Sequence, residues 1–300
     1  MHSSLYILCP GQGAQTIGMG KSIAETPAAK KLYEDANRIL GFDLMSICFN
    51  GPEDRLNQTD ISQPALFVVG VASFRSAVES GKFDEAAVTS YAGLSLGEYT
   101  ALHLAGVFDF EAGLRLVQAR GKYMQEAAIA TPSGMVALVG ADESVARDLC
   151  EKAAGGDVLT PANYNAPGQI VVSGSKAACE RAVAMAETFG VRTTPLKVAG
   201  AFHSPLMQPA AEKMEAELDR VNFDPPRRNV YSNVTAAPHD AGPSIKDLLV
   251  RQIVSPVRWE QTMQSLAADV EAKFIELSPG RTLAGLARRI NRRLAIESLG

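Results

Sequence analysis

Ser95 lies at the centre of the sequence pattern that most directly offers nucleophilic chemistry. It is the serine of a G-x-S-x-G motif, Gly93-Leu94-Ser95-Leu96-Gly97. Residues 88–92 are typical of a short buried strand and residues 98–107 of a helix, so the chain must turn sharply at the serine. Glycines tolerate such a turn, and N–H groups at a helix N-terminus can stabilise a developing oxyanion. The motif therefore predicts a nucleophilic serine, and the alternative is an ordinary Gly/Ser turn.

His203 is the histidine best suited to act as a base for such a serine. It precedes Ser204-Pro205, where Ser204 is suited to cap a helix reaching Val221 and Pro205 to be its first residue. The positive end of the helix dipole disfavours an imidazolium, so a neutral ring that can accept a proton is expected. A purely structural role for His203 is also consistent with the sequence. The surroundings of the other histidines make them weaker candidates: His2, His103 and His239.

Arg120 lies on the apolar side of a predicted helix. Capped by Asp109, that helix spans residues 110–128, and at 100° per residue Arg120 falls between Val117 and Met124 in the apolar arc. A guanidinium stays charged and is costly to bury without a partner. It therefore needs an anion, either a carboxylate of the protein or part of a ligand, unless the side chain reaches the edge of the apolar face.

A glycine-rich loop follows the first predicted strand, residues 5–9, and comes close to two nucleotide-binding patterns. A dinucleotide pattern starting at Gly11 requires a sixth-position glycine where Thr16 stands. A P-loop ending in Gly20-Lys21-Ser22 requires a glycine where Gln15 stands. Neither pattern is satisfied. The loop could still approach a ligand closely, although a plain turn is the simpler interpretation.

The elements that must position these residues indicate an α/β fold with an inserted small domain. Residues 134–198 have the order β-α-β-β-α-β of a ferredoxin-like unit, and strands alternate with helices on either side. We expect a hydrolase-like large domain with a parallel sheet core, residues 1–128 and 199–300, and a ferredoxin-like small domain, residues 129–198. Two details are also expected, namely Ser62 as a helix cap before Pro64, and a last helix over residues 283–294.

The composition argues against several classes of protein. The net charge is −4 and the basic residues are dispersed, so nucleic-acid binding is not expected. The most apolar run, residues 65–74, is too short to cross a membrane, and no signal peptide is recognisable. We expect a soluble, cytoplasmic protein. Four separated cysteines predict reduced thiols, not disulfides or a metal site: Cys9, Cys48, Cys150 and Cys179.

Six motifs together resemble those of the malonyl-CoA:acyl-carrier-protein transacylases. The resemblance runs nearly end to end. Each motif is modestly specific, but six in the same order are strongly so. They are GQGAQ at residues 11–15, GLSLGEY at 93–99, QARG at 118–121, NYNAPGQ at 163–169, AFHSP at 201–205, and Gln252 before PVRW at 256–259.

The resemblance implies how the reacting groups are arranged. Ser95 would be the nucleophile and His203 its base. The main-chain carbonyl of Gln252, and not an aspartate, would orient that histidine. The backbone N–H groups of Gln12 and Leu96 would form the oxyanion hole.

The resemblance also implies the substrates. Arg120 would bind the free carboxylate of a malonyl group, Asn163 would contact the substrate, and Phe202 fits malonyl-selective members of the family. The malonyl group would pass from malonyl-CoA through a malonyl-serine to the phosphopantetheine thiol of holo acyl carrier protein, without a metal or tightly held cofactor. The acidic carrier could dock near Arg288 and Arg289, although such a run is usually a solvated face. A monomer is expected.

Two segments depart from the family pattern. Leu94 stands where many members have histidine, and Ser278-Pro279-Gly280 differs from the usual glycine-rich form. Neither change removes a chemical group. They leave the fine acyl selectivity open, and the sequence does not distinguish a carrier of fatty acid synthesis from one of polyketide synthesis.

Two other functions are alternatives to this transfer reaction. A serine esterase or thioesterase of the α/β-hydrolase type also uses G-x-S-x-G, with Asp142 or Asp157 as its acid. The inserted unit and an arginine on an apolar face argue against it. A non-catalytic module that only docks a carrier protein is disfavoured because the serine, histidine, arginine and loop glutamine occur together.

Overall fold

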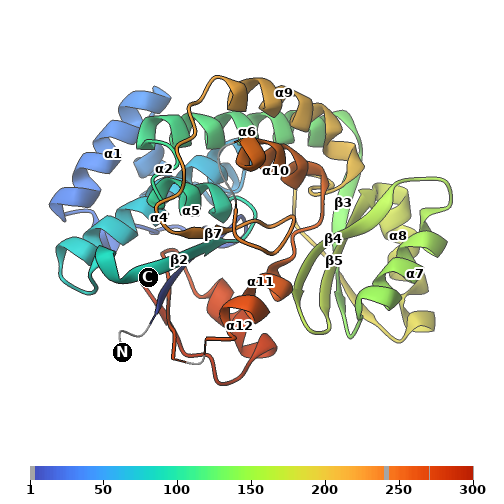
Figure 1. Cartoon of the computed structure of the whole chain (residues 1–300). Coiled ribbons are helices and arrows are strands. Elements are labelled where there is room, and N and C mark those ends of the chain that lie inside the picture. The colour runs from blue at the N-terminus through green and yellow to red at the C-terminus, as the bar shows by residue number, and fades with distance from the viewer. Residues whose placement is uncertain (1–3, 240–242, 270, 300) are drawn as a thin grey trace.

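A five-stranded parallel sheet forms the centre of the larger part of the molecule (Figure 1). The computed structural model describes residues 4–239, 243–269 and 271–299. The strand order is β7-β2-β1-β8-β9, and every neighbouring pair is parallel. The strands are β1 (Leu5–Cys9), β2 (Val88–Gly93), β7 (Asn229–Tyr231), β8 (Lys273–Glu276) and β9 (Ile296–Ser298).

Helices cover both faces of this sheet, which explains the continuous apolar run of β1. Ile7 packs in one core cluster with α4 (Thr59–Glu79), α5 (Gly97–Leu104) and α6 (Phe110–Ala130), whereas Leu8 packs in another with α11 (Trp259–Leu266) and α12 (Thr282–Ile290). The remaining helices of this part are α1 (Pro27–Leu40), α2 (Leu44–Asn50), α3 (Glu53–Leu56), α9 (Gln208–Asp219), α10 (Pro243–Val254) and the short 3₁₀ turns Lys21–Ile23, Glu85–Ala87 and Pro205–Met207.

The long helix α4 runs through the core. By length and composition it could cross a membrane, but 89% of its most apolar window is buried inside the protein. It begins at Thr59, so the prediction that Ser62 caps it was wrong. The N–H groups of Ile61 and Ser62 both donate to the carbonyl of Gln58, which starts the helix earlier and leaves Pro64 inside it.

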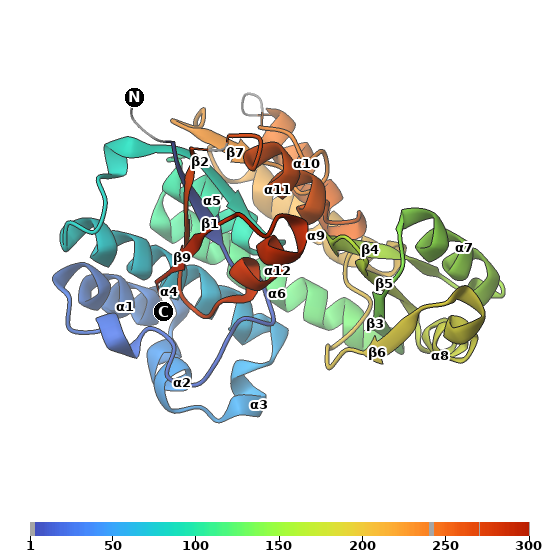
Figure 2. The same ribbon diagram turned by 90° about the horizontal axis from the view of Figure 1, so that it is seen from below.

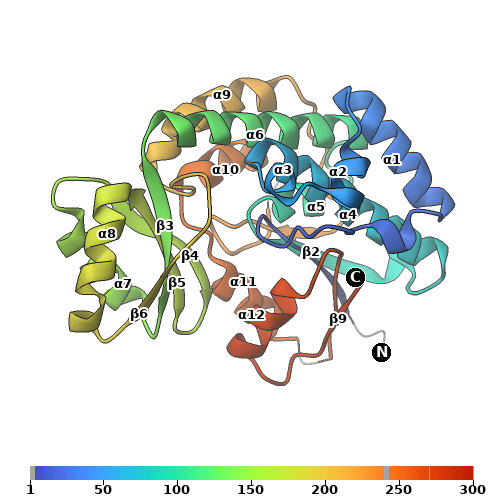
Figure 3. The same ribbon diagram turned by 180° about the vertical axis from the view of Figure 1, so that it is seen from behind.

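A separate four-stranded antiparallel sheet carries two helices and has its own core cluster (Figure 3). Its strand order, β4-β5-β3-β6, is that of a ferredoxin-like unit, which confirms the expected fold class. The domain boundaries at residues 128/129 and 198/199 stay predictions. The elements are β3 (Ser133–Val139), α7 (Glu143–Ala154), β4 (Leu159–Ala166), β5 (Gln169–Ser175), α8 (Lys176–Met185), a 3₁₀ turn (Ala186–Phe189) and β6 (Arg192–Pro195).

The two parts are joined by backbone hydrogen bonds next to the predicted site. Tyr164 N–H donates to the carbonyl of Val257 at 2.9 Å, and Val257 N–H donates to the carbonyl of Ala162 at 2.8 Å. Strand β4 of the small sheet is thereby tied to the segment that follows α10, the helix that carries Gln252.

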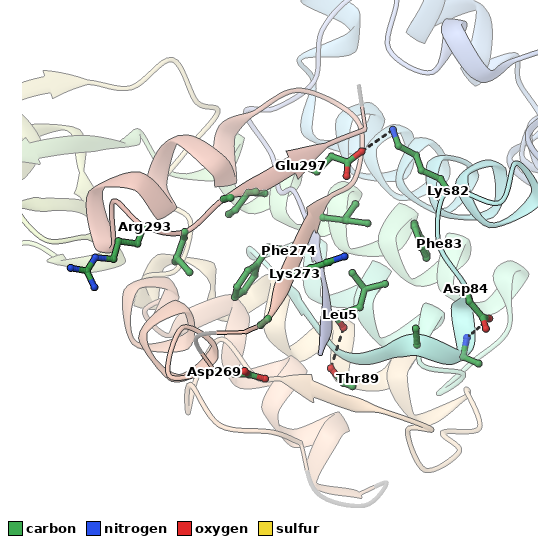
Figure 4. Close-up of a pocket in the computed structure, with 17 residues that line it drawn as sticks. Leu5, Lys82, Phe83, Asp84, Thr89, Asp269, Lys273, Phe274, Arg293 and Glu297 are labelled. Atoms are coloured by element: carbon green, nitrogen blue, oxygen red, sulfur yellow. Dashed lines mark hydrogen bonds and ion pairs between the residues drawn. The ribbon is translucent and has the colours of Figure 1, made fainter. Parts of the chain in front are cut away.

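The C-terminal segment differs from expectation. Helix α12 ends at Ile290, and the chain then forms β9 at the edge of the large sheet, so a helix reaching residue 294 was wrong. The extended backbone of Asn291 ends the helix. Strand β9 has only three residues, which are too few to give a recognisable strand pattern in the sequence. Figures 2 and 4 show this region, where a cavity of about 1190 Å³ lies between β8, β9 and residues 82–89.

Candidate active site

Ser95 stands in a tight turn between β2 and α5, as predicted. Its φ is 53°, a left-handed conformation that is uncommon for serine. The glycines on either side are needed for space. A Cβ at Gly93 would lie 1.9 Å from the carbonyl carbon of Gly97, and one at Gly97 would lie 2.1 Å from the carbonyl oxygen of Cys9. The turn therefore depends on the motif residues themselves.

His203 lies against the serine hydroxyl. Its Nε2 is 2.8 Å from Ser95 Oγ, and its Nδ1 is 2.8 Å from the backbone carbonyl of Gln252. A carbonyl only accepts, so Nδ1 carries the hydrogen and Nε2 is the free acceptor. Burial, followed by the positive charge of Arg120, lowers the pKa of His203 to about 4. A neutral ring at neutral pH agrees with this lowered pKa, whose largest cause is burial of the imidazole.

Arg120 is fully buried. Only 1% of the residue is exposed, so its side chain does not reach solvent at the edge of the apolar face. Its Nη1 donates to Gln63 Oε1 at 2.8 Å, and its Nη2 donates to Ser95 Oγ at 3.1 Å and Gln252 Oε1 at 3.0 Å. Its Nε has no hydrogen-bond partner among the residues that the structure describes, and burial lowers the pKa of the guanidinium. Within the described residues no carboxylate lies within 4.0 Å of the guanidinium.

Two backbone N–H groups near the serine are uncommitted. Gln12 follows β1, and its side chain donates to Thr59 Oγ1 at 3.5 Å. Leu96 follows the serine and is the N-cap residue of α5. Among the hydrogen bonds of residues 4–239, 243–269 and 271–299, none uses the N–H of Gln12 or Leu96.

Ser95, His203 and Arg120 line a pocket of about 320 Å³, to which strands of the small sheet and loops and helices of the larger part contribute. Asn163 of β4 is buried and lines it, as do Phe202 and Leu94. Helix α12 contributes Thr282 and Leu286. A ligand in this pocket would therefore touch both parts of the molecule at once.

The acids proposed for a hydrolase triad lie elsewhere. Asp142 is exposed and accepts from Val145 N–H as the cap of α7. Asp157 pairs with Arg181 at 2.7 Å. The Nδ1 of His203 is instead occupied by the carbonyl of Gln252.

Other groups belong to the core and not to the site. His103 contacts the carbonyl of Phe108, and burial lowers its pKa to about 4. Burial also raises the pKa of all four cysteine thiols. No group of three or more His, Cys, Asp or Glu residues that could hold a metal occurs in the part of the chain that the structure describes.

Four buried polar residues of the site were missed from the sequence: Gln63, Glu98, Asn233 and His239. Gln63 and Glu98 sit in predicted helices, where a polar residue among apolar ones could have been noticed, as it was for Arg120. His239 was considered weak because it lies in a Pro/Gly loop, but its Nε2 is 2.6 Å from Glu98 Oε1. Nothing in the local sequence marks Asn233.

Comparison with known proteins shows the family to which this chain belongs. Residues 6–293 match the acyl transferase domain family. The chain belongs to this family. It is 40% identical over 292 residues to the malonyl CoA-acyl carrier protein transacylase of Escherichia coli K12, covering 97% of this chain and 94% of the relative. The Bacillus subtilis protein of the same name is 40% identical over 297 residues, covering 97% and 92%.

Solved structures of the family have the same fold. The malonyl CoA-acyl carrier protein transacylase of Coxiella burnetii superposes with a TM-score of 0.95 at 37% identity, covering 100% of this chain and 94% of that one. A malonyl-transacylase in complex with a type II polyketide synthase acyl-carrier protein gives 0.94 at 38% identity, covering 99% and 96%. The family resemblance and the α/β fold expected from the sequence are thus confirmed.

Proposed function

We propose that this protein transfers a malonyl group from malonyl-CoA to the phosphopantetheine thiol of an acyl carrier protein. The observation that carries the proposal is Arg120, a fully buried guanidinium beside the Ser95 hydroxyl whose hydrogen-bond partners among the described residues are all uncharged. A buried cation in this position fits a substrate that brings its own carboxylate. The relatives and the carrier-protein complex named above support the same reaction.

In the first step Ser95 Oγ attacks the thioester carbonyl carbon of malonyl-CoA, while His203 Nε2 takes the hydroxyl proton. The N–H groups of Gln12 and Leu96 stabilise the oxyanion. The C–S bond then breaks, and the proton on Nε2 passes to the sulfur of CoA as it leaves. The carbonyl of Gln252 holds the histidine ring throughout.

In the second step the carrier thiol attacks the malonyl-serine. Its proton goes to His203 Nε2 and then to Ser95 Oγ as the ester bond breaks. Arg120 holds the malonyl carboxylate, while Asn163 and Phe202 bound the pocket around the acyl group. An acetyl group has no carboxylate to pair with the guanidinium, which disfavours it.

The reaction class is tested by intact-protein mass spectrometry after brief incubation with malonyl-CoA alone. One malonyl group is expected on the wild type and none on Ser95→Ala, and added holo carrier protein should remove it. Steady release of CoA without an adduct would indicate a hydrolase. Absence of both adduct and release would favour the docking module.

We also propose that the acidic carrier docks beside α12. Arg288 and Arg289 are exposed, and Arg289 lies one turn beyond Leu286, which lines the pocket. Arg289→Glu should raise the KM for the carrier and leave acylation by malonyl-CoA unchanged. Arg293→Glu is the matched control because Arg293 lines the other cavity (Figure 4). Equal effects of both charge reversals would exclude docking at Arg289.

A further inference from the structure

Glu98 is a fully buried carboxylate that the mechanism above does not use. It is the second residue of α5, a place where acids often interact with the N–H groups of their own helix. Here its oxygens accept from distant parts of the chain. Oε2 accepts from Asn233 N–H at 2.9 Å and Gln252 Nε2 at 2.8 Å, and Oε1 is 2.6 Å from His239 Nε2.

Within the described residues none of its hydrogen bonds comes from α5 itself. Its partners are separated from it by 135, 141 and 154 residues. They lie in the loop after β7 and in the last turn of α10. A carboxylate that only caps its own helix would not need three hydrogen-bond partners from these two distant segments.

We propose that Glu98, held by His239, is a positioning residue that fixes the nucleophile turn and the segment that orients His203. The two partners on Oε2 transmit this effect. Neither Glu98 nor His239 contacts the substrate or the reacting atoms in this scheme.

Asn233 connects Glu98 to the turn. Its Oδ1 accepts from Ser95 N–H at 2.6 Å, and its Nδ2 donates to the carbonyl of Gly93 at 2.7 Å. The amide therefore bridges both ends of the strained turn. Because Glu98 holds the backbone N–H of Asn233, loss of the carboxylate would release this bridge.

Gln252 provides the second connection. Its Nε2 donates to both Glu98 Oε2 and the carbonyl of Ser95, at 2.8 and 3.0 Å. The same residue accepts from Arg120 through Oε1 and from His203 through its backbone carbonyl. Glu98 thus acts on nucleophile, base and guanidinium through one residue, Gln252. The left-handed φ angles of Ser95 and His203, 53° and 57°, need such external restraint.

The test is a single-turnover measurement of malonyl-enzyme formation, which rests on the proposed function. The rate constant at saturating malonyl-CoA is normalised to the fraction of Ser95 that becomes malonylated at long times. Glu98→Ala should lower this rate constant about 100-fold, the effect of misplacing reacting groups by about 1 Å. Glu98→Gln keeps the shape, and its amide oxygen can still accept from Asn233 N–H and Gln252 Nε2, while its NH2 would face His239 Nε2 and require the Nδ1–H tautomer of that ring. Because the two partners that transmit the effect are kept, this variant should recover most of the rate.

Glu276→Ala is the matched control. Glu276 is equally buried and accepts from Leu283 and Ala284 N–H at the start of α12, at 2.8 and 2.9 Å. It should lose stability but keep the normalised rate constant. A merely structural role for Glu98 would likewise lower the malonylated fraction and leave the rate constant unchanged, which would overturn the proposal.

If Glu98→Ala does not fold, the same rate measurement on His239→Ala tests the positioning role. This substitution removes the partner of Oε1, so a tenfold or greater loss in the normalised rate constant supports the proposal, and an unchanged rate constant overturns it. A wild-type enzyme that takes no malonyl group would refute the proposed function itself. Malonylation of the wild type with no effect of either substitution would refute only the positioning role.

Discussion

Replacement of Arg120 by alanine should remove the preference for malonyl over acetyl groups. Among the described residues the guanidinium makes three hydrogen bonds, all to uncharged groups: Gln63 Oε1, Ser95 Oγ and Gln252 Oε1. Any disturbance from losing these bonds affects both acyl groups. The ratio of the two acylation rates therefore isolates the interaction with the malonyl carboxylate.

The size of the effect follows from burial. A carboxylate left without its cation in a buried site costs about 3–5 kcal/mol. At about 1.4 kcal/mol for each factor of ten, the malonyl/acetyl ratio of kcat/KM should fall about 10²- to 10⁴-fold. Arg120 is among the largest fully buried side chains, so the upper part of that range is expected unless water enters the space.

The assay is rapid-quench mass spectrometry of acyl-Ser95 with malonyl-CoA and acetyl-CoA at matched concentrations. Arg115→Ala is the control because Arg115 lies on the same helix, is exposed and pairs with Glu111. It should leave the ratio unchanged. If Arg120→Ala still prefers malonyl by the wild-type margin, the carboxylate is recognised elsewhere and the reasoning from the buried charge is wrong.

Three further outcomes are expected. Since the pKa of His203 is lowered to about 4, the imidazole stays neutral as the pH falls through 6.5. The kcat/KM for acylation should therefore decline only near pH 4, and a decline centred at pH 6.5 would contradict the site geometry. In Arg120→Ala one cause of that lowering is gone, so the acid limb measured with acetyl-CoA should move to higher pH, whereas an unmoved limb would leave burial as the sole cause. Gly97→Ala should lower the free energy of unfolding by about 3 kcal/mol, because the new Cβ would meet the backbone of Cys9. Gly285→Ala in α12 has open space around it and should raise the free energy of unfolding by up to about 1 kcal/mol. Chemical denaturation of the two variants measures both changes.

The parts of the site that the sequence predicted are those encoded by local patterns. The turn at Ser95 follows from small residues between a strand and a helix, and the burial of Arg120 follows from helical periodicity. Both signals lie within a few residues of the group concerned. The strand from Leu5 was equally accessible because a buried parallel strand is a continuous apolar run.

The missed features depend on contacts that no local pattern encodes. Glu98 meets Asn233, His239 and Gln252 across 135–154 residues, so only the folded chain brings them together. Strand β9 is too short to recognise and exists because β8 offers a free edge. The family resemblance supplied the role of Gln252, since a backbone carbonyl leaves no trace in side-chain chemistry.

The same guanidinium bears on recognition and on proton transfer. In the free protein the charge of Arg120 helps to lower the pKa of His203, while its Nη2 donates to the hydroxyl that His203 would deprotonate in the proposed reaction. A malonyl carboxylate paired with Arg120 would offset that charge and raise the pKa of His203, making it a stronger base when the correct substrate is bound. An acetyl group leaves the charge uncompensated and the base weak. Selectivity would thus be expressed in the chemical step as well as in binding, because Arg120, Ser95 and His203 share one buried hydrogen-bond network.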